Sequence, residues 1–411
     1  MPGILYSNGK SEVSNIHISI VLITLKSVAA QKRTLIVPDK DADGLTSGVI
    51  LRNTLLLLGL QKDLISVHLL RKGTSIHDDS ERDIMSALDP SYVFVLDQGS
   101  RNAPPVVTNK DHEALIIDHH WALDTDFPAG SQHVTACDSP PVATTFLLVY
   151  TICSALHPDV TATESPNPWL CVVGTHGDLG NTLKWAPPFP DMTSTFKLHT
   201  KKTLNEVVSL INAPRRTAAF NVIAAWDALS SATNPKDVLT APALLKARAE
   251  VNAEVERCTH AAPQFSSAGN IAVFRISSPF QVHPVIATRW AGHLQSPKLE
   301  VILVANDGYL PGMVNFSCRI PRCARSRDPP VNIIETLRDI AGQARDSTLR
   351  ERLGESFARG HKEASGGIVP VKEFDELIEV LEIGRTTKKK TDSSPAKPKQ
   401  SNTLANYFKK A

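Results

Sequence analysis

The sequence predicts an α/β protein in which a doubly wound parallel sheet is joined by a helical connector to a smaller α/β domain, followed by a disordered basic C-terminal tail. Short apolar runs typical of buried strands alternate with helical patterns over residues 34–185. The alternation returns from Ile271, after a mostly helical stretch over residues 202–262. Residues 384–411 are poor in apolar residues and rich in Lys, Ser and Pro, a composition that does not form a packed core.

The expected boundaries follow these changes of pattern. In chain order we expect a disordered N-terminus, a first α/β domain, a helical connector, a second α/β domain and the tail, at residues 1–15, 16–200, 201–265, 266–383 and 384–411. An apolar content of 42% is ample for two cores. The apolar segment of residues 16–25 is too short to cross a bilayer, so it predicts a core helix and no association with a membrane.

Within the first domain, the order of elements is that of a parallel sheet with helices on its faces. Strands are expected at residues 34–37, 65–70, 92–96 and 114–117, and helices at residues 49–60, 79–88 and 142–155. In the second domain, strands are expected at residues 271–276, 301–306 and 313–319, and helices after Pro284, from Val331 and at residues 372–383.

Three acids follow the first expected strand. Asp39, Asp41 and Asp43 alternate in sequence, so in an extended backbone their side chains would point the same way. Three like charges on one face repel each other unless a cation lies among them. Thr46 or Ser47 can cap the apolar helix that follows.

Three further apolar runs end in acids. One run ends at Asp97, a second ends in the triplet Asp118-His119-His120, and a third, also expected to be a strand, ends at Asp178. Parallel strands present their carboxyl ends at one edge of the sheet, where open α/β sheets place their sites. Burying carboxylates beside imidazoles is costly unless a divalent metal holds them.

The residue types indicate which metal. Carboxylates with one or two imidazoles suit Mn²⁺ or Mg²⁺ better than metals that prefer thiolates. Six or more such ligands indicate two ions, the usual arrangement for splitting phosphate esters. Any one of these acids could merely cap a helix, but their joint presence with the histidine pair favours a metal site. His176 is left open between a residue that supports Asp178 and a polar loop residue.

Taken together, these segments resemble a known family. D-K-D-A-D-G-L-T-S, L-D-Q-G, D-H-H and G-D-L-G, in this order, resemble the four motifs of the DHH phosphoesterases, and the first looks most like that of the RecJ branch of single-strand exonucleases. V-N-F-S-C-R and G-H-K-E-A-S-G-G resemble two elements of the DHHA1 substrate domain. The resemblance covers residues 30–383, and implies a DHH catalytic domain and a smaller DHHA1 domain.

The resemblance also implies roles for single residues. The metal ligands would be Asp39, Asp41, Asp43, Asp97, His119 and Asp178, with Asp97 between the two ions. In the catalytic centre, Asp118 would support the site from behind and His120 would touch the phosphate. The substrate-binding residues of the second domain would be Arg319, Gly360, His361, Gly366 and Gly367.

Charge is unevenly spread along the chain. Residues 384–411 hold eight basic residues and one acid, a net charge of +7, which leaves −5 for the rest of a chain whose total is +2. A net negative charge over residues 1–383 is not typical of a protein that binds duplex nucleic acid tightly. The run Lys388 to Lys390 is either a solvated stretch or a nuclear import signal. We expect a nuclear location, and otherwise a cytoplasmic one.

The end of the tail carries a short apolar pattern. Leu404, Tyr407 and Phe408 have the i, i+3, i+4 spacing of one helical turn. The pattern resembles the motif by which replication and repair proteins bind the sliding clamp, proliferating cell nuclear antigen, although Ser401 stands where that motif has Gln. Binding of the clamp through residues 400–411 is therefore expected.

The function we expect is hydrolysis of phosphodiester bonds in single-stranded nucleic acid or short oligonucleotides, by an exonuclease of DNA repair or replication that uses two Mn²⁺ or Mg²⁺ ions. Two alternatives stay open. One is a small-molecule phosphatase acting on a nucleotide, a cyclic dinucleotide or polyphosphate, and the other is a non-catalytic replication scaffold. The six cysteines have no paired spacing, so disulfides are not expected.

Overall fold

The computed structural model describes residues 23–137, 143–162, 165–187, 189–260 and 262–383. The chain divides into two compact units, Met1–Val251 and Asn252–Ala411, with the boundary inside helix α10 (Pro242–Thr259). Within the described residues, no helix has both the length and the hydropathy of a membrane span. The six cysteines are free thiols. The clamp-like residues Leu404, Tyr407 and Phe408 lie outside the described part of the chain.

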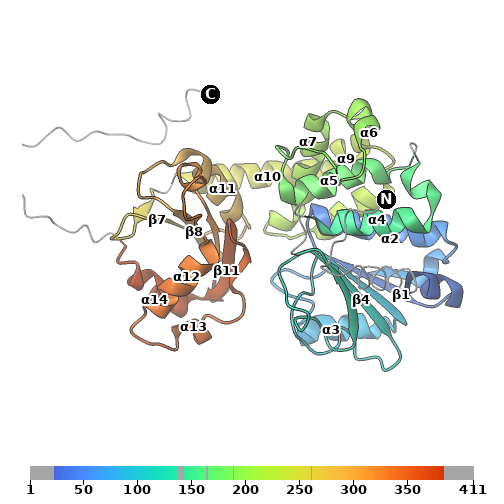
Figure 1. The fold of residues 1–411 in the computed structure, drawn as a ribbon, viewed down its shortest axis with the longest axis horizontal. Coiled ribbons are helices and arrows are strands. Elements are labelled where there is room, and N and C mark those ends of the chain that lie inside the picture. The colour runs from blue at the N-terminus through green and yellow to red at the C-terminus, as the bar shows by residue number, and fades with distance from the viewer. Residues whose placement is uncertain (1–22, 138–142, 163–164, 188, 261, 384–411) are drawn as a thin grey trace, which may run out of the picture. The chain divides into compact units, whose positions relative to one another are not determined.

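The first unit is built on a parallel sheet with the strand order β2-β1-β3-β4-β5 (Figure 1). Every pair of neighbouring strands is parallel. The strands are β1 (Thr34–Pro38), β2 (Ile65–Val67), β3 (Tyr92–Leu96), β4 (Glu113–Asp118) and β5 (Ser131–Thr135). The carboxyl ends of these strands therefore meet at one edge, which confirms the predicted parallel α/β sheet.

Alternate residues of a strand face opposite sides of the sheet, and here both sides are apolar. Helices therefore cover both faces. Ile36 and Phe94 belong to the core under α2, α4 and α5, whereas Leu35 and Val93 belong to the core that holds Met85 of α3. Before α10, the first unit contains α2 (Ala42–Leu57), α3 (Asp79–Ala87), α4 (Thr145–Leu156), α5 (Asn167–Leu179), α6 (Thr193–Leu198), α7 (Lys201–Asn212), α8 (Val222–Ser231) and α9 (Pro235–Leu239), and residues 23–30 are also helical.

The prediction that α2 starts near residue 49, capped by Thr46 or Ser47, is wrong. Helix α2 begins at Ala42, directly after its N-cap Asp41, and the Thr46 hydroxyl donates to the carbonyl of Ala42 at 2.6 Å. The three aspartates are therefore not an extended, alternating run. The first lies in the turn after β1, the second caps the helix, and the third stands in its first turn.

The tight strand-to-helix turn explains this difference. A Cβ at Gly44 would lie only 2.6 Å from the carbonyl oxygen of Asp39, so only glycine allows the first turn of α2 to lie so close to the end of β1.

The prediction of a strand before Asp178 is also wrong, because this segment is helix α5. Pro168 occupies the first turn, where its missing N–H costs nothing. The helix is buried on nearly every side, and an apolar run of that kind has no periodicity to tell a helix from a strand. A Cβ at Gly174 would lie 2.5 Å from Thr46 Oγ1, so this glycine lets α5 pack closely on α2.

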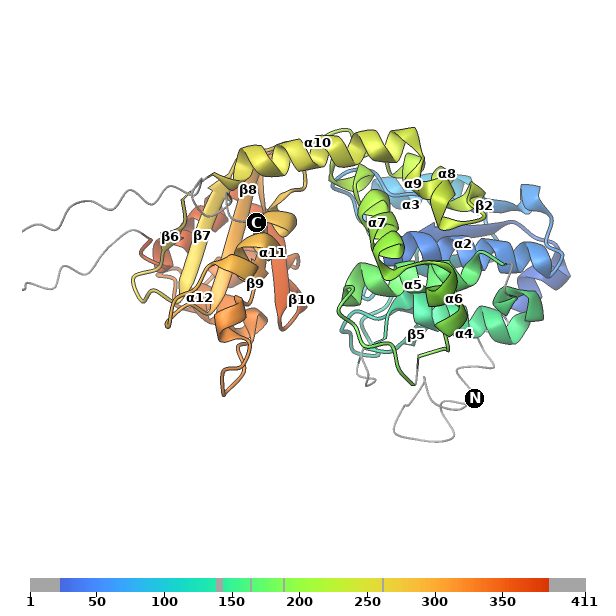
Figure 2. The same ribbon diagram turned by 90° about the horizontal axis from the view of Figure 1, so that it is seen from above.

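The second unit contains a mixed sheet with the order β10-β11-β9-β8-β7-β6 (Figure 2). Only the pair β7 and β8 is parallel. The strands are β6 (Gln264–Phe265), β7 (Ile271–Ile276), β8 (Val301–Leu310), β9 (Met313–Arg319), β10 (Phe357–His361) and β11 (Ala364–Pro370). The helices are α11 (His283–His293), α12 (Ile333–Gly342), α13 (Leu349–Arg352) and α14 (Val371–Val380). A second α/β unit is thus present.

Candidate metal centre

Seven of the side chains selected from the sequence come together at the carboxyl edge of the parallel sheet. They form three overlapping groups, in each of which one ligand atom per residue lies within 4.8 Å of the others. The groups are Asp39, Asp41 and Asp97; Asp43, Asp97, His119 and Asp178; and Asp97, His119 and His120. Asp97 belongs to all three, which is the position expected of a carboxylate between two cations.

Asp97 is held in an unusual backbone conformation directly after β3. Its φ angle is 63°, in the left-handed region that few residues other than glycine adopt. Its N–H donates to the carbonyl of Ile117 at 2.9 Å, and its Oδ1 accepts from the hydroxyl of Thr145 at 3.0 Å. Such a conformation costs about 1–3 kcal/mol and is typical of functional positions.

Asp43 is fully buried at the N-terminus of helix α4. Its two oxygens accept hydrogen bonds from the backbone N–H groups of Thr145, at 2.9 Å, and Phe146, at 2.7 Å. The positive end of the helix dipole therefore stabilises its charge. Even so, burial and the nearby charges of Asp97 and Asp178 raise the pKa of Asp43 well above its usual value. A divalent cation would relieve this repulsion.

Thr145 was not selected from the sequence, although it contacts both buried acids. The signal was available, because Thr144-Thr145 precedes an apolar run and threonine is a preferred N-cap. Thr144 is indeed the N-cap of α4, accepting from the N–H of Leu147 at 3.3 Å. What the sequence cannot show is that this helix start lies against the ends of two distant strands.

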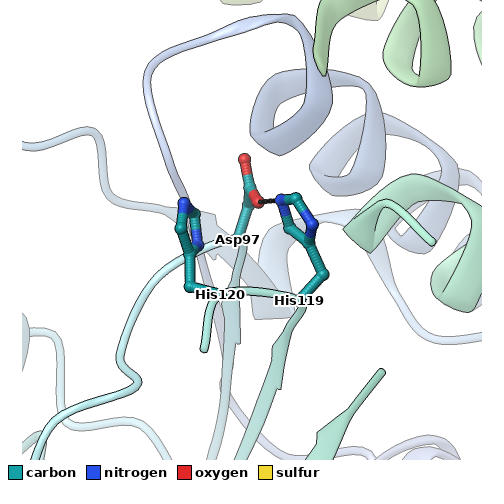
Figure 3. A group of neighbouring side chains, drawn as sticks. All are labelled: Asp97, His119 and His120. Atoms are coloured by element: carbon teal, nitrogen blue, oxygen red, sulfur yellow. Dashed lines mark ion pairs between the residues drawn. The ribbon is translucent and has the colours of Figure 1, made fainter. Parts of the chain in front are cut away.

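His119 Nε2 lies 3.4 Å from Asp97 Oδ1 (Figure 3). The same nitrogen lies 2.9 Å from Asp178 Oδ2. Its Nε2 is also 3.8 Å from Asp43 Oδ2. Burial alone would lower the pKa of His119, but its hydrogen bonds to Asp178 and Asp97 outweigh burial and raise the pKa to about 12. Oxygen donors with an imidazole in this arrangement are a ligand set that fits Mn²⁺ or Mg²⁺.

Asp118 is buried and orients His120. Its Oδ1 accepts from His120 Nδ1 at 2.7 Å and from the N–H of His119 at 2.8 Å, and its Oδ2 accepts from the hydroxyl of Ser100 at 2.6 Å. Burial opposes a charged imidazole, but the hydrogen bond to Asp118 outweighs it and raises the pKa of His120 to about 9. His120 can therefore present its Nε2 side as a cation. The supporting role expected of Asp118 stays a prediction.

Arg215 is a second residue that sequence reasoning missed. Its Nη2 lies 3.7 Å from Asp41 Oδ2, and its Nε donates to Asn212 Oδ1 at 3.0 Å. Arg215 follows helix α7, which is far from the acidic motifs in the sequence. A guanidinium beside the acidic groups is suited to binding an anionic substrate.

His176, left open above, is a buried residue of helix α5. Its Nδ1 pairs with Asn205 Oδ1 of α7 at 2.9 Å. It borders an open hollow of about 270 Å³ that is lined by amide, hydroxyl and guanidinium groups; its lining residues are His176, Gly177, Asn181, Asn205, Val208, Ser209, Asn212 and Arg216. The loop interpretation of His176 is thus wrong, since the residue lies within a helix.

In the second unit, the residues expected to bind substrate lie on three neighbouring strands. Ala364 of β11 pairs with Arg319 of β9 on one side and with His361 of β10 on the other. Directly paired residues point to the same face of a sheet, so Arg319 and His361 share a face about 10 Å apart. Arg319 donates to the hydroxyl of Ser317 at 2.9 Å, and burial lowers its pKa.

The three glycines of this region are fixed by packing. Gly360 has a φ of 106°, which favours glycine. A Cβ at Gly366 would lie 2.3 Å from the carbonyl oxygen of Phe316, and one at Gly367 would lie 2.8 Å from the ring of Phe316. These glycines thus allow close approach of β11 to its neighbours.

Comparisons with known proteins agree with this architecture. Residues 33–170 match the model of the DHH family, N-terminal domain. None of the curated proteins compared with the chain matches it.

Several solved structures share the fold. RecJ from Thermus thermophilus in complex with Mn²⁺ superposes with a TM-score of 0.62 at 18% identity, over 93% of this chain and 55% of that one. The chain thus spans about half the length of that RecJ. An exonuclease RecJ bound to manganese gives a TM-score of 0.56 at 18% identity, over 93% of this chain and 95% of that one.

A DHH domain from a protein described as a member of a family of ribosomal proteins gives a TM-score of 0.66 at 14% identity, over 93% of both chains. The order of the motifs, the shared fold and the match to the family model agree with one another. Residues 33–170 therefore match the N-terminal domain of the DHH family, and the fold of the chain is similar to that of RecJ.

Proposed function

We propose that the protein is a metal-dependent phosphodiesterase that hydrolyses phosphodiester bonds of single-stranded nucleic acid or short oligonucleotides as an exonuclease, with two Mn²⁺ or Mg²⁺ ions. The observation that carries the proposal is the shared position of Asp97. Its carboxylate belongs to a group with Asp39 and Asp41 and to another with Asp43, His119 and Asp178. One carboxylate common to two ligand groups is the arrangement that two-metal phosphoesterases require.

The residues of the site would have three roles: binding the ions, contacting the phosphate and adding positive charge. Asp39, Asp41, Asp43, Asp97, His119 and Asp178 would hold the ions, which, when bound, lower the pKa of a water and neutralise phosphate charge. His120 would donate a hydrogen bond to a non-bridging oxygen of the phosphate, because Asp118 keeps its ring oriented and charged. Arg215 would add a second positive group at the side of Asp41.

Three considerations favour nucleic acid over a small phosphate ester. RecJ, whose fold this chain shares, is named an exonuclease. Arg319 and His361 share one face of the second sheet, where they would hold a phosphate or a strand end. The net charge of −5 on residues 1–383 disfavours tight binding of a duplex and favours short or single-stranded substrates. Action in DNA repair or replication, and a nuclear location, follow from the sequence of the tail alone.

Hydrolysis by defined variants tests the proposal. The wild type should cleave 5′- or 3′-labelled single strands in Mn²⁺, and EDTA should abolish cleavage. Asp97→Asn and His119→Ala should lower kcat/KM by at least about a thousandfold, since each removes a ligand of the reactive centre. Asp227→Asn is the matched control, because Asp227 is an exposed residue of α8 that belongs to none of the ligand groups, and it should retain wild-type rates.

Two results would overturn the proposal. Cleavage of nucleotides or polyphosphate but not of oligonucleotides would identify a small-molecule phosphatase. No cleavage of any substrate by the Mn²⁺-loaded wild type would identify a non-catalytic scaffold.

A further inference from the structure

We propose that Trp121, together with Leu123, forms a platform on which one unpaired base of the substrate stacks. The proposal rests on the proposed function and deepens it, since it names the part of the substrate that is recognised. Trp121 directly follows His120, and both platform side chains are large, apolar and exposed.

The exposure of the platform is unusual for such side chains. Trp121 and Leu123 are each 56% exposed. Tryptophan is normally highly buried on average, because its ring contributes a large apolar area. Trp121 and Leu123 are separated in the sequence only by Ala122, so both can offer apolar area to a planar aromatic ligand.

The loop that carries the platform is fixed at several points. Ala122, between the two exposed residues, packs against the core under α3, so its neighbours face outward. The N–H of Leu123 donates to Asp126 Oδ2 at 3.0 Å, and the N–H of Asp126 donates to the carbonyl of Leu123 at 2.8 Å. Beyond this turn, the buried ring of Phe127 stacks on His133. A platform held in this way loses little conformational entropy on binding.

The position of Trp121 next to His120 indicates that the ligand of the platform is a base. His120 would touch the reacting phosphate, and consecutive Cα atoms are about 3.8 Å apart, so Trp121 is within reach of the nucleoside attached to that phosphate. The same loop carries Asp124 and Asp126, whose charges repel the phosphates of a strand. A neutral base is therefore favoured here over the sugar–phosphate backbone.

Stacking on Trp121 also explains how the chain would select single strands. A base inside a duplex is already stacked on its neighbours and paired, whereas an unpaired base can lie on an aromatic side chain. Stacking of one base on an aromatic residue corresponds to about a 5- to 150-fold gain in affinity. Because every base has an aromatic face, this selection would not depend on sequence.

Abasic substrates test the inference. Single strands of one sequence, each with an abasic residue at one of the positions near the scissile bond, are compared with the intact strand in Mn²⁺. For the wild type, one position should raise KM by about 5- to 150-fold, with kcat nearly unchanged, because stacking is equal in the ground and transition states.

Variants of the platform complete the test. Trp121→Ala should raise KM for the intact strand by the same factor, and the abasic residue should then cause no further increase. Trp121→Phe should keep most of the affinity, and Leu123→Ala should lose a smaller part. Leu198→Ala, which truncates a 68% exposed leucine of α6, is the matched control and should behave like the wild type.

The inference is overturned if the effects of Trp121→Ala and of the abasic residue multiply, or if Trp121→Ala leaves KM unchanged. Should the wild type cleave no substrate, the proposed function fails, and the inference is then decided by binding alone. Fluorescence anisotropy in EDTA should still show tighter binding of the intact strand than of the abasic strand by the wild type, and equal binding by Trp121→Ala. Equal binding of both strands by the wild type would overturn it.

Discussion

At the scale of the residue, the pair Asp118 and His120 shows how a side chain outside the metal ligands sets the chemistry of the site. Asp118 Oδ1 lies 2.7 Å from His120 Nδ1. The carboxylate also accepts from three backbone N–H groups and from the hydroxyl of Ser100. Because these donors outweigh burial, the pKa of Asp118 lies well below its usual value. The imidazole is thereby kept charged and in one orientation.

Asp118→Asn should lower the pKa of His120 from about 9 toward its ordinary value of 6.5 in the metal-free protein. The His120 side chain is 44% exposed, so solvent screens part of the effect and the loss of stability should be about 1–2 kcal/mol. Titration of the His120 ring protons by NMR measures the shift. An unchanged His120 pKa would contradict the role assigned to Asp118.

A pH dependence follows from the buried groups of the metal-free protein. Burial raises the pKa of Asp43 and Asp97 above 3.8, and contacts with carboxylates raise that of His119 from 6.5 to about 12. In all three cases the folded state binds protons more tightly than the unfolded state, so stability falls as pH rises. The two acids lower the stability of the folded state as the pH rises above 3.8. His119 lowers it further as the pH rises from 6.5 toward 12.

Calorimetric melting in EDTA should therefore give a melting temperature that falls between about pH 5.5 and pH 8.5. With Mn²⁺ the fall should shrink or reverse, because the ion replaces the protons that these ligands lose. A melting temperature in EDTA that rises across this window would show that the three groups are not coupled as described.

At the scale of the element, two glycines determine how closely helices approach the edge that carries the ligands. A Cβ at Gly174 would lie 2.5 Å from Thr46 Oγ1 and 2.8 Å from Phe146 Cβ, which places α5 tightly against α2 and α4. A Cβ at Gly177 would lie 2.9 Å from Ala42 Cβ. Because Asp178 is on the same helix, its distance from His119 depends on this packing.

Gly174→Ala should destabilise the protein by about 1–3 kcal/mol through overpacking, and should weaken Mn²⁺ binding as α5 moves outward. Gly292→Ala in α11 is the matched control, since nothing lies within 4 Å of the added Cβ. The control should leave stability unchanged or raise it by about 0.5–1 kcal/mol, as alanine favours a helix over glycine. Equal stability of Gly174→Ala and the wild type would rule out the close crossing of α5 and α2.

Sequence patterns predict some of these elements and not others. The strands before Asp97 and Asp118 could be predicted because each is a short apolar run bounded by polar residues. Helix α5 could not, because a helix buried on most sides has no polar face to give its period. The start of α2 was placed too late, since Asp41 acts as ligand candidate and N-cap at once.

At the scale of the whole molecule, the parallel sheet explains why the predicted ligands meet. Strand ends separated by many residues lie at one edge, so Asp97 and the His119-His120 pair could be grouped from the order of elements alone. Thr145 and Arg215 could not be grouped, since their places depend on how helices α4 and α7 pack. The second α/β unit was expected from the returning alternation, and its sheet is present.

The tail gives a prediction that involves the full chain. Tyr407→Ala/Phe408→Ala should weaken binding to the sliding clamp more than a hundredfold, because burying each aromatic ring contributes about 1.5–3 kcal/mol. The wild type should bind in the micromolar range, because the tail composition predicts a disordered segment whose ordering on binding costs free energy. Calorimetric titration of both proteins against the clamp measures this, and equal heats would contradict the proposed role of Leu404, Tyr407 and Phe408.

The central claim is that Asp97 joins two metal sites, and the stoichiometry of Mn²⁺ binding tests it most directly. Isothermal titration of the metal-free full chain should give two ions for the wild type and for the control variant Asp227→Asn. Asp97→Asn should lose tight binding at both sites, because its carboxylate belongs to both ligand groups. One ion in the wild type, or two tightly bound ions in Asp97→Asn, would contradict the account.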